Sequence, residues 1–352
     1  MANPRPIAVI GCGAISELTY LPALARRSEW RAQTWLVEPN LDRGRALAER
    51  FGFVGAQVVP DLRALPRETG LAVNATPSHL HVATTLALLA NGINVVVEKP
   101  FAETAKDARG LVEAARGRAL LAVNQSRRFG PSNQLAQDIL RSGTLGTIKQ
   151  ITWAEGRKFD WPTQSGFNFR RPWQGRPRGV VLDIGVHVLD LLYWWLDERP
   201  VVVAAEMDGH GGPEASVSAR LAIGTAALDM RLSYLVRLDN QFVVHGTNGA
   251  IRGSTADYDR LEIQVGSGPW RTMRARGSTD AVAGSGRLIE NMLAAAAGAE
   301  PLLIDAETTL PALAAVDDLY ARAHEGVSAC YRDFLPPPAP AEQENRVTEL
   351  VA

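Results

Sequence analysis

Short apolar runs alternate with helical patterns along the first third of the chain, and this alternation restricts the fold more than any other feature. The runs rich in β-branched residues predict strands at 7–10, 34–37, 71–74, 93–97 and 119–123. The segments between them place apolar residues at helical spacing, at 15–27, 42–51, 80–91 and 105–115. Strands that alternate with helices indicate βαβ units, and therefore a parallel, doubly wound sheet.

The pattern changes after residue 125. One further helix is expected at 131–142. The next apolar runs, separated by short polar or glycine turns, predict strands at 148–154, 201–207, 216–223, 226–233, 241–245 and 261–265. Two late helices are expected at 288–297 and 308–323. Strands that follow one another with short turns form antiparallel sheets. We therefore expect an α/β protein in which the parallel sheet is followed by an α+β domain with a large, mainly antiparallel open sheet.

This division gives three segments. Residues 1–124 form the predicted nucleotide-binding domain, and residues 125–335 form the predicted substrate-binding and oligomerisation domain. Residues 336–352 are rich in proline and carry few apolar side chains, which is typical of a disordered tail. An open sheet needs a cover on its second face, and a second copy of the chain can supply it. We therefore expect a homo-dimer or homo-tetramer.

Composition excludes several classes of protein. The formal net charge of -1 produces no long-range field that would attract nucleic acid or an anionic membrane. The two cysteines, Cys12 and Cys330, are too few for a disulfide framework, which fits a reducing compartment. No signal region precedes the first strand, and ionisable residues interrupt the apolar run 180–196. We expect a cytoplasmic protein that binds neither nucleic acid nor membrane.

A glycine-rich turn follows the first predicted strand. Its residues expected to contact a dinucleotide are Gly11, Cys12, Gly13, Ala14 and Ile15. Gly11 permits the tight turn, and Gly13 lets a pyrophosphate approach the backbone at a helix N-terminus. Glu38 ends the second strand roughly twenty residues later, where an acid accepts both ribose hydroxyls. Its carboxylate would repel a ribose phosphate, so we expect NAD rather than NADP, although Arg43 is close enough in sequence to weaken that repulsion.

The strand at 93–97 runs directly into Glu98, Lys99 and Pro100. Ligands of open α/β sheets bind outside the carboxyl ends of the strands, so Lys99 is a candidate catalytic residue. The alternative is a strand-end lysine that only faces solvent. Thr76 and Pro77 follow the preceding strand and would line the nicotinamide side of the site. An ordinary strand-ending turn explains Pro77 equally well.

The apolar helix expected over 180–196 carries three polar residues. Asp183 and His187 are four residues apart and share one helical face, with Asp190 close to it. A carboxylate in that position can fix the imidazole tautomer, although a single histidine on a helix is more often a core residue. One histidine and two carboxylates do not form a metal-ligand spacing, so we expect no metal, although His210 and His245 could approach in the folded chain.

Taken in order, these motifs resemble the Gfo/Idh/MocA oxidoreductases, the glucose-fructose oxidoreductase and inositol dehydrogenase type. The resemblance covers roughly residues 5–330. The motifs that carry it are Gly11-Cys12-Gly13, Glu38, Thr76-Pro77 with His81, Glu98-Lys99-Pro100, Arg128-Phe129 and Asp183-x-Gly-x-His187-x-x-Asp190. It implies a Rossmann domain, a second α/β domain whose open sheet mediates oligomer contacts, bound NAD(P), and substrates that are polyols, sugars or sugar nucleotides.

The resemblance also implies roles for individual residues. Lys99, Asp183 and His187 match a catalytic set in which the histidine is the general base or acid. Lys99 would stabilise the developing alkoxide, and Asp183 would orient His187. The further implied cofactor contacts are Thr76, Pro77, His81, Glu98 and Lys99. The expected substrate contacts are Lys99, Arg128, Trp161, Arg170, Asp183 and His187.

The segment 156–178 is rich in arginine and aromatic residues, including Trp161 and Arg170. Such residues suit a phosphate, a carboxylate or a nucleotide base, although a solvated connector would also carry them. The resemblance implies a sugar-like substrate, and a functional role of this segment would favour a sugar nucleotide or sugar acid over neutral inositol. The leading hypothesis is an NAD-dependent oxidoreductase acting on a ring secondary alcohol or ketone of a sugar, cyclitol or nucleotide-linked sugar. The alternatives are a redox-neutral NAD-dependent glycosidase and a regulatory cofactor-binding paralogue.

Overall fold

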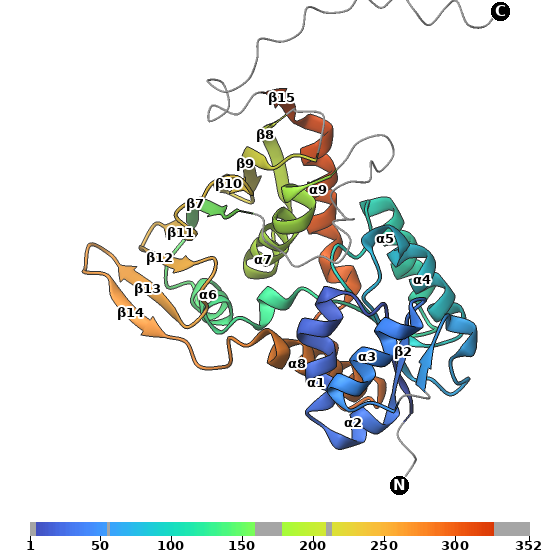
Figure 1. Ribbon diagram of the computed structural model, residues 1–352. Helices are drawn as coiled ribbons and strands as arrows, with labels where there is room; N and C mark the ends of the chain where they lie inside the picture. Colours follow the sequence, from blue (N-terminus) through green and yellow to red (C-terminus); the bar gives the residue numbers. More distant parts are fainter. Residues whose placement is uncertain (1–4, 55–56, 159–177, 209–212, 327–352) are drawn as a thin grey trace, which may run out of the picture.

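The computed structural model describes residues 5–54, 57–158, 178–208 and 213–326. Two β-sheets organise it, one in each of two neighbouring domains (Figure 1). The N-terminal domain carries the smaller sheet. The second domain carries the larger one, from which the β13–β14 hairpin projects at one edge (Figure 1).

The first sheet has six strands in the order β3-β2-β1-β4-β5-β6, and all its neighbouring strands are parallel. Its strands are β1 Ile7–Ile10, β2 Thr34–Val37, β3 Val58–Val59, β4 Leu71–Asn74, β5 Asn94–Val97 and β6 Leu121–Val123. The central strands are buried on both faces, which explains their unbroken apolar runs. The predicted doubly wound sheet is confirmed. Its order reverses between β1 and β4, and a dinucleotide binds at such a reversal.

The helices of this domain match the sequence expectation to within two residues for α3, α4 and α5. They are η1 Ser16–Tyr20, α1 Leu21–Ala25, α2 Ser28–Gln33, α3 Leu41–Phe51, α4 Ser78–Ala90 and α5 Ala105–Ala115, with the short η3 Leu62–Ala64. The helix expected over 15–27 is confirmed in place, and η1 makes part of it π-helical. It becomes α-helical again near Pro22, which has no backbone N–H to donate into the preceding turn. Extended backbone at Arg27 then ends it.

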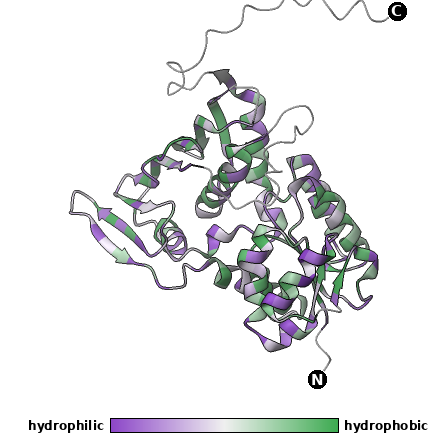
Figure 2. Cartoon of the chain, in the orientation of Figure 1, coloured by the Kyte–Doolittle hydropathy of each residue, from purple (hydrophilic) through white to green (hydrophobic). Residues whose placement is uncertain are grey.

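The second sheet has nine strands in the order β14-β13-β12-β11-β7-β10-β9-β8-β15. Its strands are β7 Ile148–Gly156, β8 Pro200–Asp208, β9 Ser216–Ile223, β10 Ala226–Ser233, β11 Gln241–Gly246, β12 Gly249–Ser254, β13 Arg260–Val265, β14 Arg271–Arg274 and β15 His324–Gly326. Only the pairs β7–β10 and β8–β15 are parallel, so the predicted mainly antiparallel sheet is confirmed. Strands β12, β14 and β15 were not predicted, because they are short, glycine-containing or charged. In Figure 2 the outer hairpin β13–β14 alternates hydrophilic and hydrophobic colours.

The helices that follow residue 125 are η4 Ser126–Phe129, α6 Pro131–Arg141, η5 Val181–Gly185, α7 Val186–Leu196, α8 Ala281–Ala296, η6 Ala306–Thr309 and α9 Leu310–Arg322. Of these, α6, η5, α7 and α9 pack against strands of the second sheet. The aromatic rings of Trp153, Trp195 and Phe242 pack together between sheet and helix, with ring centroids 5.0–6.2 Å apart. Val201 and Val203 on β8 remain 53% and 62% exposed. None of the described helices has the length and apolar character needed to span a bilayer.

The chain returns to the first domain near its end. Helix α8 packs against η1 and α1, and Leu288, Ile289 and Met292 join the apolar core formed by Val9, Leu24 and their neighbours (Figure 1). The predicted single boundary near residue 125 omitted this return. The chain returns because helix α8 has an apolar face. Packing against η1 and α1 buries that face.

Candidate active site

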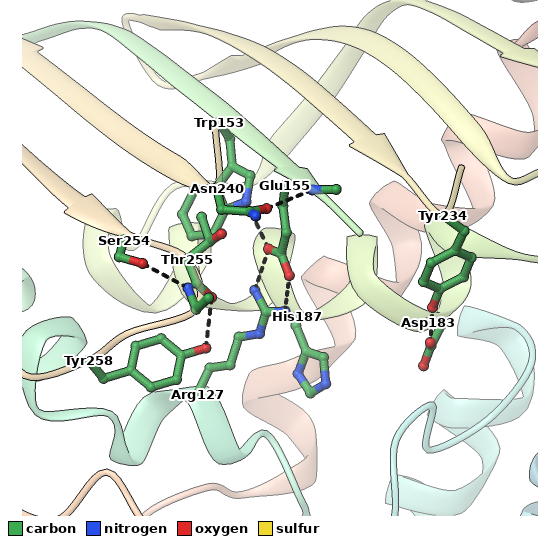
Figure 3. A network of polar contacts seen from close by, with 12 residues as sticks. Arg127, Trp153, Glu155, Asp183, His187, Tyr234, Asn240, Ser254, Thr255 and Tyr258 are labelled. Carbon is green, nitrogen blue, oxygen red and sulfur yellow. Dashed lines mark hydrogen bonds and ion pairs between the residues drawn. The ribbon is translucent and has the colours of Figure 1, made fainter. Parts of the chain in front are cut away.

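The two domains meet at Lys99 and Asp183. Lys99 directly follows Glu98 at the carboxyl end of β5, and its Nζ donates to the Asp183 carboxylate and, at 3.1 Å, to the Asp183 carbonyl oxygen. Asp183 lies in the π-helical turn η5, a distortion often found at functional sites. Tyr234, directly after β10, donates its hydroxyl to the other carboxylate oxygen (Figure 3). Burial alone would raise the pKa of Asp183, but Lys99 and Tyr234 together hold it below its usual value.

His187 lies on α7 and is 8% exposed. Its Nδ1 is 2.8 Å from Oε1 of Gln125, which follows β6. An amide oxygen only accepts, so Nδ1 carries the proton and Nε2 keeps a free lone pair. Burial, together with the positive charges of Lys99 and Arg127, lowers the pKa of His187 well below its usual value. His187 is therefore a neutral imidazole that can accept a proton. Gln125 takes the orienting place that was expected for Asp183.

Arg127 was missed by the sequence reasoning. It makes two hydrogen bonds to Glu155, of 2.8 and 2.6 Å, and both side chains are largely buried. Figure 3 shows Arg127 extending beside His187 from η4, with Glu155 reaching it from β7. Burial would lower the pKa of Arg127, but Glu155 raises it, so the guanidinium stays charged. The cations Lys99 and Arg127 thus both lie near the imidazole.

Arg128, the neighbouring residue, has a different environment. It is 4% exposed and donates to both carboxylate oxygens of Asp190 at 2.8 and 2.6 Å. A further donor reaches the hydroxyl of Thr308 at 3.1 Å. The guanidinium therefore binds protein groups, and the substrate contact that the sequence suggested for Arg128 stays a prediction. Trp161 and Arg170, the substrate contacts predicted in the segment 156–178, lie outside the described residues.

The glycine turn after β1 has the shape of a dinucleotide cradle. Gly11 adopts a φ of +89°, and a Cβ there would lie 2.8 Å from the carbonyl oxygen of Ala75. A Cβ on Gly13 would meet nothing within 4 Å, so open space lies in front of the turn. These two features match what a pyrophosphate requires. Ala14 and Ile15 are partly exposed in the same turn, before η1 begins.

Glu38 closes this cradle at the end of β2. Its two carboxylate oxygens accept from the backbone N–H groups of Cys12, at 2.9 Å, and Asn40, at 3.0 Å. Burial is the main reason why the pKa of the Cys12 thiol is raised to about 12, so the thiol stays neutral. Cys12 contributes its backbone to this part of the site, and Glu38 supplies the negative charge. The cradle therefore fits the pyrophosphate and ribose of a nicotinamide dinucleotide.

Two of the expected cofactor contacts point into the protein. His81 is 1% exposed, with its ring nitrogens 2.7 Å from the carbonyl oxygen of Pro100 and 2.8 Å from that of Thr76. Burial lowers its pKa to about 4, and a neutral ring donates its one N–H to only one of these two carbonyl oxygens. Glu98 is 6% exposed and accepts from the hydroxyl of Tyr20 at 2.7 Å. Pro77 is exposed and Thr76 is partly exposed at the sheet edge, where the nicotinamide side was expected.

Comparison with known proteins identifies the family. Residues 5–125 match the model described as an oxidoreductase family with an NAD-binding Rossmann fold, and residues 133–252 match the GFO/IDH/MocA C-terminal domain. The chain belongs to the Gfo/Idh/MocA family. The resemblance stated from the sequence motifs is thereby confirmed, and with it the two-domain fold.

Individual relatives of this Gfo/Idh/MocA protein have diverged considerably. The D-glucoside 3-dehydrogenase of Escherichia coli is 27% identical over 190 residues, which span 54% of this chain and 53% of that enzyme. A 3-ketoreductase from Actinomadura kijaniata, solved with NADP and TDP-benzene, superposes with a TM-score of 0.76 at 22% identity, over 93% of this chain and all of that one. A levoglucosan dehydrogenase solved with NADH and levoglucosan gives 0.75 at 18%, over 90% and 96% of the two chains. The structural likeness shows a common fold.

Proposed function

We propose that this protein is an NAD-dependent oxidoreductase that transfers hydride between nicotinamide and a ring secondary alcohol or ketone of a sugar, cyclitol or nucleotide-linked sugar. The observation that carries the proposal is the meeting of Lys99 with Asp183 beside a neutral His187 at the carboxyl edge of the Rossmann sheet. Such an edge is where the nicotinamide end of a dinucleotide reaches in this class of fold.

The proposed chemistry divides between the two domains. A bound nicotinamide dinucleotide would accept or supply the hydride, held by the cradle of Gly11, Gly13 and Glu38. Nε2 of His187 takes the proton from the substrate hydroxyl during oxidation and returns it during reduction. The ammonium of Lys99 stabilises the negative charge that develops on the same oxygen. Asp183, itself held by Tyr234, keeps Lys99 in place.

The environment of Glu38 supports NAD over NADP. A ribose phosphate would bring negative charge toward this carboxylate. Arg43 was the one nearby cation considered in the sequence. Its Nε donates to the Cys12 carbonyl oxygen at 2.6 Å and its terminal nitrogen to Glu17 at 3.0 Å, so its donors are engaged by protein groups, although Glu17 is shared with Arg50. Relatives of this fold use either dinucleotide, as the two solved structures above illustrate.

The names of the relatives and the charges beside His187 both support a sugar-like substrate. The similar proteins carry the names of sugar dehydrogenases and reductases. Arg127 lies beside His187 but is balanced by Glu155, and Arg157, the next residue after β7, is exposed and acts electrostatically on Asp183. A neutral sugar ring therefore meets no unbalanced charge at the reacting group itself, while an anionic substituent would find Arg157 close by.

Initial rates of nicotinamide absorbance change test the proposal. Purified protein with NAD or NADP is assayed against inositols, free sugars, sugar acids and nucleotide sugars. His187→Ala should lower kcat by about 10²- to 10⁴-fold, the contribution typical of a general base. His245→Ala, an exposed histidine on β11, is the matched control and should retain the wild-type rate. Equal activity in His187→Ala and wild type would refute the assigned role.

The same assay separates the redox-neutral alternative. A glycosidase that oxidises and re-reduces its sugar produces no net absorbance change, yet releases a leaving group from an aryl glycoside only when NAD is present. That outcome would replace the dehydrogenase assignment while keeping the cofactor site. Bound NAD with neither activity would favour the regulatory paralogue.

A further inference from the structure

The segment 179–187, called the catalytic segment below, begins with three backbone N–H groups. All three donate to one residue, Glu214. Gly179 N donates to Oε2 at 2.8 Å and Val181 N to Oε1 at 2.9 Å. Val180 N donates to the Glu214 carbonyl oxygen at 2.9 Å. These donors open the helical segment that carries Asp183 and His187, and N-terminal N–H groups of a helix have no partner within it. Glu214 therefore caps the segment from a distant part of the chain.

This cap is tertiary. A helix is usually capped by a serine, threonine, aspartate or asparagine directly before its first turn. Here the position before the first helical turn is Gly179, where a Cβ would lie 2.0 Å from the Glu214 carbonyl oxygen. The glycine thus permits Glu214 to approach closely, and the side chain of Glu214 is 5% exposed. The start of the catalytic segment is set by Glu214 and not by its own sequence.

Glu214 and its neighbour also reach the other side of the site. The Ala215 carbonyl oxygen accepts from Tyr234 N at 2.7 Å, and the Tyr234 hydroxyl donates to Asp183. Two consecutive residues therefore hold the backbone of the catalytic segment and the backbone of the tyrosine that contacts its carboxylate. A shift of residues 214–215 would move both partners of that contact.

The same cap is linked to the domain that carries Lys99. Tyr320 on α9 donates its hydroxyl to Glu214 Oε1 at 2.8 Å, and the Arg178 guanidinium lies 4.6 Å from the centre of the Tyr320 ring. Arg178 in turn donates to the Glu103 carbonyl oxygen, four residues beyond Lys99, and to Asp317 at 3.2 Å. A chain of contacts therefore runs from the start of the catalytic segment to the loop after β5.

We propose that Glu214 is the positioning residue of the active site, setting the place of Asp183 and His187 relative to Lys99. The kinetic consequence rests on the proposed function, whereas the structural consequence does not. Displacement of a catalytic group by about 1 Å lowers turnover by about 10²-fold. Glu214 touches the N-terminal backbone of the segment and contacts none of the residues of the dinucleotide cradle, so its effect should fall on turnover and leave cofactor affinity unchanged.

Glu214→Gln is the main variant. Three donors face the two carboxylate oxygens, from Gly179, Val181 and Tyr320, and the amide of glutamine offers one oxygen and one N–H₂ group. At least one of these three donors would then face the glutamine N–H₂ group, which accepts no hydrogen bond. Glu262→Gln, on β13 and paired with Arg252 at the surface, is the matched control. Tyr320→Phe removes a single donor and serves if the main variant does not fold.

Hydrogen exchange and kinetics are measured on the same proteins. The expected result for Glu214→Gln is faster amide exchange confined to residues 179–187, kcat lowered by about 10- to 100-fold, and a dinucleotide Kd within about twofold of wild type. Tyr320→Phe should show the same pattern more weakly, and Glu262→Gln should match wild type. Unchanged exchange at 179–187, or faster exchange spread over the whole chain with normal kcat, would overturn the proposal. A wild-type protein without redox activity refutes the proposed function, and the exchange pattern still decides the role of Glu214.

Discussion

The buried Arg128–Asp190 pair allows a sharp test of how this protein is stabilised. The two side chains are 4% and 1% exposed and share two charge-assisted hydrogen bonds. Arg128→Met leaves the Asp190 carboxylate buried without its partner. Breaking such a pair destabilises a protein by about 3–5 kcal/mol, because the remaining charge is uncompensated. With a urea m-value of about 3 kcal/mol per M, the unfolding midpoint should fall by about 1–2 M.

The pH dependence of the same variant has a definite sign. Burial already raises the pKa of Asp190 despite the opposing charge of Arg128. Without Arg128 that pKa rises further above its unfolded value of about 3.9. The native state then holds a proton that the unfolded chain releases, so the stability of Arg128→Met should fall as pH rises from about 4 through the folded pKa.

The assay is equilibrium urea unfolding followed by circular dichroism and tryptophan fluorescence, since Trp194 lies 5.9 Å from the Arg128 guanidinium. The double variant Arg128→Met with Asp190→Leu removes both charges and should recover most of the lost stability. A loss below about 1 kcal/mol in the single variant, or an equal loss in both, would refute this reasoning. A recovered stability with a substrate KM raised by about tenfold or more would instead restore the substrate contact first expected for Arg128.

Three further outcomes are expected. Because the pKa of His187 is depressed, kcat/KM for oxidation should stay level as pH falls through 6.5, and an acid limb centred at or above that value would contradict a neutral buried base. Glu38→Gln should weaken NADH binding by about tenfold or more, and NADPH binding by less, in fluorescence titrations; an equal loss for both would contradict its role in selecting the dinucleotide. Val203→Lys, on the exposed face of β8, should dissociate the expected homo-oligomer in sedimentation velocity, and a monomeric wild type would contradict that expectation.

The motifs near strand ends were predictable because they depend on local order along the chain. The glycine turn at Gly11, the acid at Glu38 and the lysine at Lys99 each follow directly from one apolar strand. In a parallel sheet, the carboxyl ends of neighbouring strands meet at one edge. The strand pattern is therefore enough to predict that these residues lie at one edge of the sheet.

Adjacent arginines show where such reasoning stops. Arg127 and Arg128 are neighbours in η4, yet one faces Glu155 beside His187 and the other is buried against Asp190. Their order in the chain carries no information about which side each faces, since that depends on the path of the backbone through a short 3-10 helix. The sequence reasoning selected Arg128, which is buried against Asp190 of α7, and omitted Arg127, which lies beside His187.

The sequence by itself indicated the parallel sheet, most strands of the second sheet and the glycine turn, because these follow from periodicity and strand ends, and it made Lys99, Asp183 and His187 candidates. The tertiary structure decided what those side chains touch. Gln125 lies 62 residues from His187, and Tyr234 lies 51 residues from Asp183. Contacts over such separations arise only when the domains pack, since no local pattern encodes which distant polar group satisfies a buried donor or acceptor.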